Sequence, residues 1–212
     1  MFHLTHKELL ELAFWLRCGM EAERAQLRRY VQALKIPDVQ MKMVMAAPAV
    51  YIDTPVPRQI LEIGTGPHWG LLPFIEADLK FGVDPLYPAY EAVGILEERN
   101  GIRRVDEPFE HWDTDQQFDL IVTTNALDHG EMGFYLLPKI WRMLKPGGRF
   151  YLHVHLRPQE LKNLLHDHPL TEEQLDKHLG YTDLIQERRE LLDRDLDGFE
   201  SKTLIGVWRK PE

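Results

Sequence analysis

Two features of this chain could hold a nucleoside: a glycine-rich turn, and an acid that closes the next hydrophobic run. The turn lies in Leu61–Gly70, which reads Leu-Glu-Ile-Gly-Thr-Gly-Pro-His-Trp-Gly. Gly64 and Gly66 permit a sharp bend and let a ligand approach where a Cβ atom would collide. Asp84 follows the run Leu79–Val83, and its carboxylate can accept both ribose hydroxyl protons. The pattern predicts a site for an adenosine-like cofactor.

The residues around the turn favour a cofactor without a pyrophosphate. Dinucleotide-binding turns usually space three glycines as Gly-x-Gly-x-x-Gly, which places a helix N-terminus against the pyrophosphate. Here the third glycine, Gly70, comes one residue late, and Pro67, His68 and Trp69 fill the turn. Glu62 also directs a carboxylate toward the turn, which suits a cationic ligand and opposes a pyrophosphate.

From residue 59 onward, strand-length hydrophobic runs alternate with helix-length stretches. The expected strands are Gln59–Ile63, Leu79–Val83, Ile102–Val105, Phe118–Thr123 and Arg149–His155. The expected helices lie near Trp69–Glu76, Pro88–Arg99 and Met132–Leu144. This alternation predicts an α/β fold with a doubly wound, mostly parallel sheet. The last runs, up to Ser201–Arg209, surround a turn at Asp197 and Gly198 and predict a C-terminal antiparallel hairpin at the sheet edge, which makes seven strands in all.

The N-terminal part of the chain is expected to be a helical extension. Thr5 followed by Glu8 is a capping-box pattern, and Pro48, Pro55 and Pro57 mark a linker into the first strand. We therefore divide the chain into an N-terminal extension or lid, residues 1–57, and an α/β domain, residues 58–212.

Composition and charge restrict the class of partner. The net charge of -9 disfavours a nucleic-acid partner, because phosphate binding needs a basic surface. The single cysteine, Cys18, excludes an internal disulfide and fits a reducing compartment. The N-terminus lacks the profile of a signal peptide, and no apolar run has membrane-spanning length. We expect a cytoplasmic enzyme that acts on a small molecule, with its oligomeric state left open, a homodimer included.

Five segments, in order and at the right spacing, make the chain resemble the class I S-adenosylmethionine-dependent methyltransferases. The segments are Leu61-Glu-Ile-Gly-Thr-Gly, Val83-Asp84, Phe118-Asp-Leu-Ile-Val, Asn125-Ala-Leu-Asp-His and Leu144-Lys-Pro-Gly-Gly-Arg-Phe. The resemblance covers about residues 59–155 and implies a Rossmann-like domain with S-adenosyl-L-methionine as cofactor. It also implies methyl transfer by in-line displacement.

The resemblance implies a role for each matching residue. The methionine half of the cofactor would meet the turn residues Glu62, Gly64, Thr65 and Gly66. Asp84 would bind the ribose, and Pro85 or Leu86 would lie against the adenine. Asn125 would sit beside the methionine carboxylate.

The segment Val105–Glu110 departs from the family pattern at the adenine edge. The acid that usually contacts the adenine amino group is replaced by Pro108, or displaced to Asp106 or Glu110. A backbone amide near Phe109 is the remaining candidate for that contact.

Asp128 and His129 are the candidate catalytic residues, because they follow the fourth strand at the end where open parallel sheets bind ligands. His129 could take a proton at neutral pH; the alternative is that both residues cap or orient the next helix. His153 and His155 alternate on the fifth strand and share one face, so they could line a substrate pocket. With His166 and His168 a zinc site is conceivable, but no recognised ligand spacing accompanies them, and we predict no metal.

Two rival functions come from different classes. A methyltransferase-like domain could bind cofactor without catalysis and serve as a partner subunit. Tyr135 and Lys139 match the Tyr-x-x-x-Lys spacing of NAD(P)-dependent short-chain dehydrogenases. Pro138 between them would disturb the helix that must align the pair, and the glycine spacing differs. We therefore expect a methyltransferase.

Overall fold

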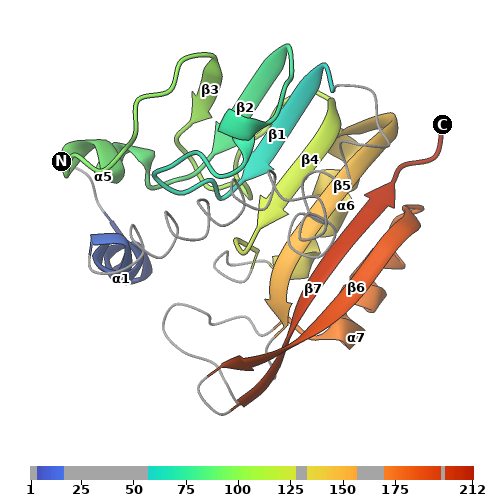
Figure 1. Ribbon diagram of the computed structural model, residues 1–212. Helices are drawn as coiled ribbons and strands as arrows, with labels where there is room; N and C mark the ends of the chain where they lie inside the picture. The colour runs from blue at the N-terminus through green and yellow to red at the C-terminus, as the bar shows by residue number, and fades with distance from the viewer. Residues whose placement is uncertain (1–3, 17–56, 128–132, 157–169, 197–198) are drawn as a thin grey trace, which may run out of the picture.

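The computed structural model describes residues 4–16, 57–127, 133–156, 170–196 and 199–212, and centres on one seven-stranded sheet (Figure 1). The strands are β1 Gln59–Ile63, β2 Leu79–Val83, β3 Ile102–Val105, β4 Phe118–Thr124, β5 Leu144–Leu156, β6 Ile185–Leu196 and β7 Phe199–Arg209. Their order across the sheet is β3-β2-β1-β4-β5-β7-β6. Strands β1 to β5 pair in parallel, whereas β7 pairs antiparallel with both β5 and β6. The predicted mostly parallel sheet with a C-terminal hairpin is confirmed.

The helical elements are shorter than the sequence predicts. They are α1 His6–Phe14, η2 Leu72–Phe74, α5 Tyr87–Ala92, η3 Gly133–Leu136, α6 Leu137–Met143 and α7 Glu172–Leu179. The helix predicted near Trp69–Glu76 is wrong: Trp69 and Gly70 have positive φ, which leaves only the 3-10 turn η2. The helix predicted for Pro88–Arg99 ends at Ala92, because Gly94 adopts φ 74°.

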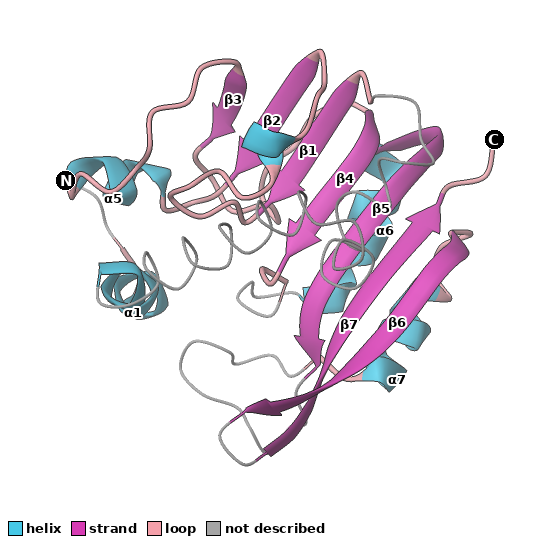
Figure 2. Ribbon diagram, viewed as in Figure 1, coloured by secondary structure: helices cyan, strands magenta, loops and turns pink. Residues whose placement is uncertain are grey.

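Two apolar clusters hold the layers on the faces of the sheet (Figure 2). On one face, Leu137 and Ile140 of α6 and Leu175 of α7 join the larger cluster with Ile121 of β4. On the other face, the segment around η2 packs on alternate residues of β1, β4, β5 and β7. None of the described helices has the length and apolarity that a membrane crossing requires.

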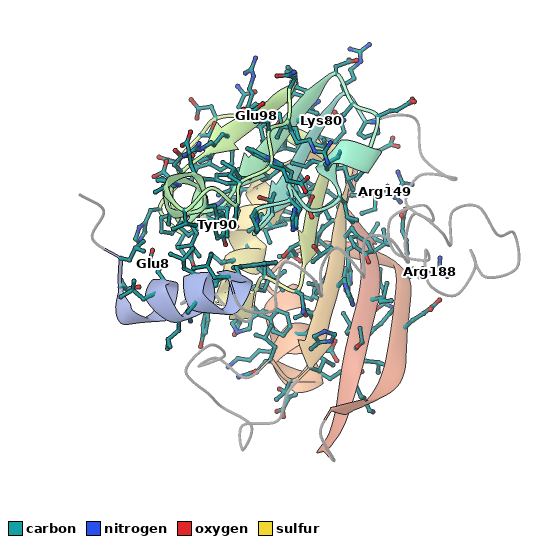
Figure 3. All side chains as sticks on the ribbon, turned by 60° about the vertical axis from the view of Figure 1, so that its left-hand side comes forward. Glu8, Lys80, Tyr90, Glu98, Arg149 and Arg188 are labelled. Carbon is teal, nitrogen blue, oxygen red and sulfur yellow. The ribbon has the colours of Figure 1, made fainter. Side chains whose placement is uncertain are left out.

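Helix α1 lies beside α5 (Figure 1), and its residue Leu12 packs with Trp15 against the apolar cluster around Tyr87 and Tyr90. Its N-terminus carries the predicted capping box, in which Glu8 N donates to Thr5 Oγ1 at 3.2 Å and Thr5 N donates to the Glu8 carboxylate at 2.6 Å. The ring of Trp15 meets Tyr90 edge-on, with 6.4 Å between ring centroids. Figure 3 shows Tyr90 on the side of α5 that faces α1, with Glu8 at the outer end of α1. The N-terminal helix therefore contacts the apolar cluster that includes Trp69 of the glycine-rich turn.

Candidate cofactor site

The turn after β1 depends on glycine at two positions. Gly64 has φ 70°, and a Cβ atom there would lie 2.2 Å from Cβ of Ala126, in the turn after β4. Gly66 has φ 62°. Both conformations are unfavourable for residues with a Cβ atom. The short distance at Gly64 shows that the backbone of the turn after β1 packs directly against the side chain of Ala126 in the turn after β4. The predicted tight glycine turn is present.

Glu62 is fully buried and organises this turn from inside. One carboxylate oxygen accepts hydrogen bonds from the backbone N–H groups of Leu71, at 2.8 Å, and Leu72, at 3.1 Å. The other accepts from the Thr124 hydroxyl at 3.2 Å. A Cβ atom on Gly70 would collide with the same carboxylate at 2.2 Å. Glu62 thus fixes the far end of the turn and connects it to the end of β4, a role that the sequence does not reveal.

Asp84 connects the turn after β1 with the end of β2. Its carboxylate accepts from Gly66 N at 2.8 Å and from Leu86 N at 2.9 Å, and it is 5% exposed. Burial raises the pKa of Asp84 to about 6, although the two backbone hydrogen bonds favour the ionised form. Each oxygen keeps a lone pair beyond those two bonds, so the carboxylate can still accept hydroxyl protons.

Tyr87 is a buried residue of the site that sequence reasoning missed. Its hydroxyl is hydrogen-bonded to Thr65 Oγ1, and its ring lies 4.6 Å from that of Trp69. A Cβ atom on Gly82 would come within 2.4 Å of the Tyr87 oxygen, so this glycine in β2 makes room for the phenol. Burial and the charge of Asp84 raise the pKa of Tyr87, which stays a neutral phenol. The one available signal was its position three residues after Asp84.

His68 and Trp69 hold the turn against the chain after α5. The indole N–H of Trp69 donates to the Glu97 carbonyl at 2.7 Å, and His68 Nδ1 lies 2.9 Å from the Glu97 carboxylate. Glu97 N in turn donates to the Pro67 carbonyl at 3.0 Å. Both aromatic side chains are buried, which agrees with packing under the loop and leaves little surface for a substrate.

The residues expected at the adenine differ in exposure. Leu86 is buried with Trp69, Tyr87 and other apolar residues, whereas Pro85 is half-buried. Of the two, Pro85 has more surface to offer a ligand. Asp106, one candidate for the displaced acid, is ion-paired with Arg104.

Lys139 fixes the segment 109–112, which is expected at the adenine from the sequence. Its ammonium group donates to the carbonyls of Phe109, at 2.6 Å, Glu110, at 3.2 Å, and Trp112, and it lies 4.8 Å from the Phe109 ring centroid. Tyr135 is 65% exposed and lies in η3, a separate element from α6. The Tyr135–Lys139 spacing therefore reflects a structural lysine that holds carbonyl groups.

Asn125 ends β4 in a strained conformation that faces the same edge of the sheet. Its φ is 57°, and its backbone N–H donates to the His153 carbonyl at 2.7 Å. Among the residues that the structure describes, no hydrogen-bond partner reaches its buried side-chain oxygen. A buried amide oxygen without a partner costs free energy, so this atom is suited to accept a hydrogen bond from a bound ligand.

Some predicted residues cannot be placed. Asp128 and His129, as well as His166 and His168, lie outside the described residues, as does most of the predicted extension or lid. Within the described ranges, no group of three or more potential metal-ligand side chains occurs.

Comparisons with known proteins show the family and the fold of this chain. A family model described as a methyltransferase domain matches residues 27–193. The N-methyltransferase NodS from Bradyrhizobium japonicum WM9, solved with S-adenosyl-L-homocysteine, is 18% identical with a TM-score of 0.62, over 83% of this chain and 87% of that one. No curated protein matches the chain.

Two further solved structures show the same fold. The Burkholderia thailandensis 1,6-didemethyltoxoflavin-N1-methyltransferase, with 1,6-didemethyltoxoflavin and S-adenosylhomocysteine bound, is 20% identical with a TM-score of 0.56, over 91% of this chain and 90% of that one. A chain from a Haloferax volcanii complex that contains the Trm112 methyltransferase activator is 16% identical with a TM-score of 0.65, and both chains are covered completely.

Proposed function

The chain belongs to the methyltransferase-domain family, and from that premise we propose that it transfers a methyl group from S-adenosyl-L-methionine to a small-molecule acceptor. The observation that carries the proposal is that Glu62, Asp84 and Asn125 all lie at the carboxyl edge of the sheet, at the ends of β1, β2 and β4, where each is held by hydrogen bonds. In an open α/β sheet, ligands bind outside this edge.

The residues present fit this cofactor. The ribose hydroxyl groups would donate to Asp84, whose carboxylate retains free lone pairs. The side-chain oxygen of Asn125, buried and without a partner among described residues, would accept from the methionine end. The glycine turn allows the methionine end to approach the backbone at Gly64 and Gly66. Pro85 and the chain around Phe109 would border the adenine, with Lys139 holding that chain in place.

The chemistry requires mainly positioning from the protein. The bound cofactor supplies an electrophilic methyl group on a sulfonium, whose displacement needs an acceptor lone pair in line with the carbon–sulfur bond. Alignment of reactants can supply about 7–11 kcal/mol of the barrier. The polar atoms of the site are fixed before the ligand binds, because Glu62 and Asp84 hold the turns by hydrogen bonds to backbone N–H groups. We keep Asp128 and His129, which come after β4 in the sequence, as proposed catalytic residues that contact the acceptor.

A labelled-methyl assay tests the proposal. The purified protein is incubated with methyl-tritiated S-adenosylmethionine and a panel of small hydroxyl, amine and thiol acceptors, and labelled product and S-adenosylhomocysteine are measured together. We expect equal amounts of both with at least one acceptor, and loss of both in Asp84→Ala. Asp115→Ala, which removes an exposed carboxylate between β3 and β4, is the matched control. Cofactor binding without turnover on any acceptor would contradict catalysis and favour a non-catalytic partner subunit.

A further inference from the structure

We propose that Tyr87 is a positioning residue for the cofactor: its hydroxyl fixes the glycine-rich turn and thereby holds the carboxylate of Asp84 where the ribose would bind. This proposal rests on the proposed function and assigns a residue that supports the cofactor without contacting its reacting atoms. It is carried by a closed circuit of hydrogen bonds that joins the start of α5 to the turn after β1 and to the end of β2.

The circuit uses both backbone polar groups of Gly66. Its N–H donates to one oxygen of Asp84 at 2.8 Å, and its carbonyl oxygen accepts from the Thr65 hydroxyl at 3.3 Å. Thr65 Oγ1 is in turn hydrogen-bonded to the Tyr87 hydroxyl. Leu86, the residue before Tyr87, closes the circuit, because its N–H donates to the other oxygen of the same carboxylate at 2.9 Å. The phenol therefore acts on the carbonyl of Gly66 through Thr65, while Asp84 holds the N–H.

Every polar side chain of the circuit is buried. Tyr87 is 0% exposed, Thr65 is 1% exposed and Asp84 is 5% exposed. Bulk water does not reach these groups, so the removal of one hydroxyl leaves its buried partner unsatisfied or forces the chain to move. The bond between Tyr87 and Thr65 therefore contributes directly to the conformation of the turn.

The ring of Tyr87 is packed on several sides. A Cβ atom on Gly82 would lie 2.4 Å from the phenol oxygen and 3.2 Å from Thr65 Cγ2, so β2 approaches both side chains as closely as a glycine allows. The ring centroid of Trp69 lies 4.6 Å from that of Tyr87, and the guanidinium carbon of Arg104 lies 5.4 Å from it. Packing therefore presents the hydroxyl to Thr65 before any ligand binds.

This arrangement predicts an effect on cofactor binding and little effect on the methyl-transfer step. Hydrogen bonds weaken steeply when donor and acceptor lose their alignment, so the ribose hydroxyl groups need a carboxylate in a fixed orientation. Without the Tyr87 hydroxyl, the cofactor must order the turn when it binds, and that ordering lowers the affinity. Once the cofactor is bound, the turn is ordered with or without the hydroxyl, so kcat at saturating cofactor should change little.

Calorimetric titration with S-adenosylhomocysteine is the first test. We expect Tyr87→Phe, which removes only the hydroxyl, to raise Kd by about 5-fold to 30-fold. Tyr90→Phe is the matched control, because Tyr90 is also 0% exposed in α5 but its ring meets Trp15 beside α1. Its Kd should equal that of the unsubstituted protein. An unchanged Kd in Tyr87→Phe, or an equal loss of affinity in both variants, would overturn the inference.

Substitutions of Thr65 show whether the two hydroxyl groups act together. Thr65→Ser keeps a hydroxyl and should bind S-adenosylhomocysteine as the unsubstituted protein does, whereas Thr65→Val should weaken binding as Tyr87→Phe does. The double variant Tyr87→Phe/Thr65→Val should bind no more weakly than the weaker single variant, because both substitutions remove the same link. Additive losses of affinity in the double variant would overturn the inference.

The amide proton resonance of Gly66 reports on the circuit without any ligand. In NMR spectra recorded at a temperature where all variants are folded, we expect this resonance to shift in Tyr87→Phe and to stay in place in Tyr90→Phe. An unchanged Gly66 resonance in Tyr87→Phe would overturn the inference. Failure of the unsubstituted protein to bind S-adenosylhomocysteine would instead contradict the proposed function, so the two failures are distinguishable.

Discussion

The carboxylate of Asp84, at the end of β2, accepts a hydrogen bond of 2.8 Å from the backbone N–H of Gly66, in the turn after β1. This bond joins two loops that are 18 residues apart in the chain. The same carboxylate holds Leu86 N at the start of the chain toward α5. Asp84 therefore shapes the site before any ligand binds, and its substitution is expected to affect both the loops and the ligand.

Replacement of Asp84 by Ala is expected to weaken binding of S-adenosylmethionine by about 1.5–3 kcal/mol, because charge-assisted hydrogen bonds to the ribose are lost. Isothermal titration calorimetry measures the change directly. Asp115→Ala, in an exposed loop, should bind as the unsubstituted protein does. An unchanged dissociation constant for Asp84→Ala would remove this residue from the site.

Cofactor affinity is expected to fall as the pH drops through about 6, the raised pKa of Asp84. Protonation removes acceptor capacity from the carboxylate, so Kd should rise about tenfold for each pH unit below that value. The stability of the unliganded protein should change in the opposite sense. The pKa of Asp84 is higher in the folded state than in the unfolded state, so the folded state binds the proton more tightly. Protonation of Asp84 therefore stabilises the folded protein at low pH, and this stabilisation is lost as the pH rises through about 6.

Calorimetric titrations and thermal melts between about pH 5 and pH 7.5 check both signs. The Asp84→Asn variant serves as control, since it cannot ionise at this position. A cofactor affinity that stays flat across this range in the unsubstituted protein would exclude Asp84 as the titrating group.

Gly64→Ala is expected to destabilise the fold by about 2–5 kcal/mol, because its Cβ atom meets Ala126 and its φ is positive. Gly94→Ala measures the cost of the positive φ without a steric clash, since Gly94 has φ 74° and a Cβ atom added there would meet no other atom within 4 Å. It should cost only about 1–2 kcal/mol. Urea unfolding of both variants compares the two values; equal losses would mean that the β1 and β4 turns do not pack as described.

Lys139→Met is expected to lower stability by about 1–3 kcal/mol, because carbonyl groups of the 109–112 segment lose their donor. Lys177→Met, on the exposed surface of α7, is the control. Urea unfolding measures both. A loss of nicotinamide-dependent activity in Lys139→Met, in place of a stability loss, would revive the dehydrogenase interpretation.

His129→Ala is expected to reduce turnover by about tenfold or more while cofactor affinity changes little, because the proposed contact of His129 is with the acceptor. Steady-state kinetics and calorimetry on the same preparation separate the two effects. Intact turnover would remove His129 from the catalytic residues.

The strands could be predicted from sequence because each central strand is a hydrophobic run with a defined end. β1, β2 and β3 have the predicted bounds. The helices were overpredicted where single residues adopt positive φ: Trp69 and Gly70 interrupt one helix and Gly94 ends another. Periodicity is insensitive to such local backbone conformations, which depend on tertiary contacts such as that between Gly70 and Glu62.

The sequence predicts which polar residues lie at the site, but it does not predict all of the contacts that they make. Glu62 and Asp84 were expected to face a ligand, yet both also bind backbone N–H groups of the turns. Lys139 was recognised by its spacing to Tyr135, although the carbonyls that it binds lie 27 to 30 residues away. Long-range contacts of this kind leave no periodic pattern in a single sequence. The shared face of His153 and His155 was predictable, because it follows from strand alternation alone.

Cofactor selectivity tests the account most directly. The purified protein should be titrated calorimetrically with S-adenosylmethionine, S-adenosylhomocysteine and NADH. We predict micromolar binding of the first two and none of the third, with the affinity for the first two reduced in Asp84→Ala. Binding of NADH alone, or of none of the three, would contradict the account.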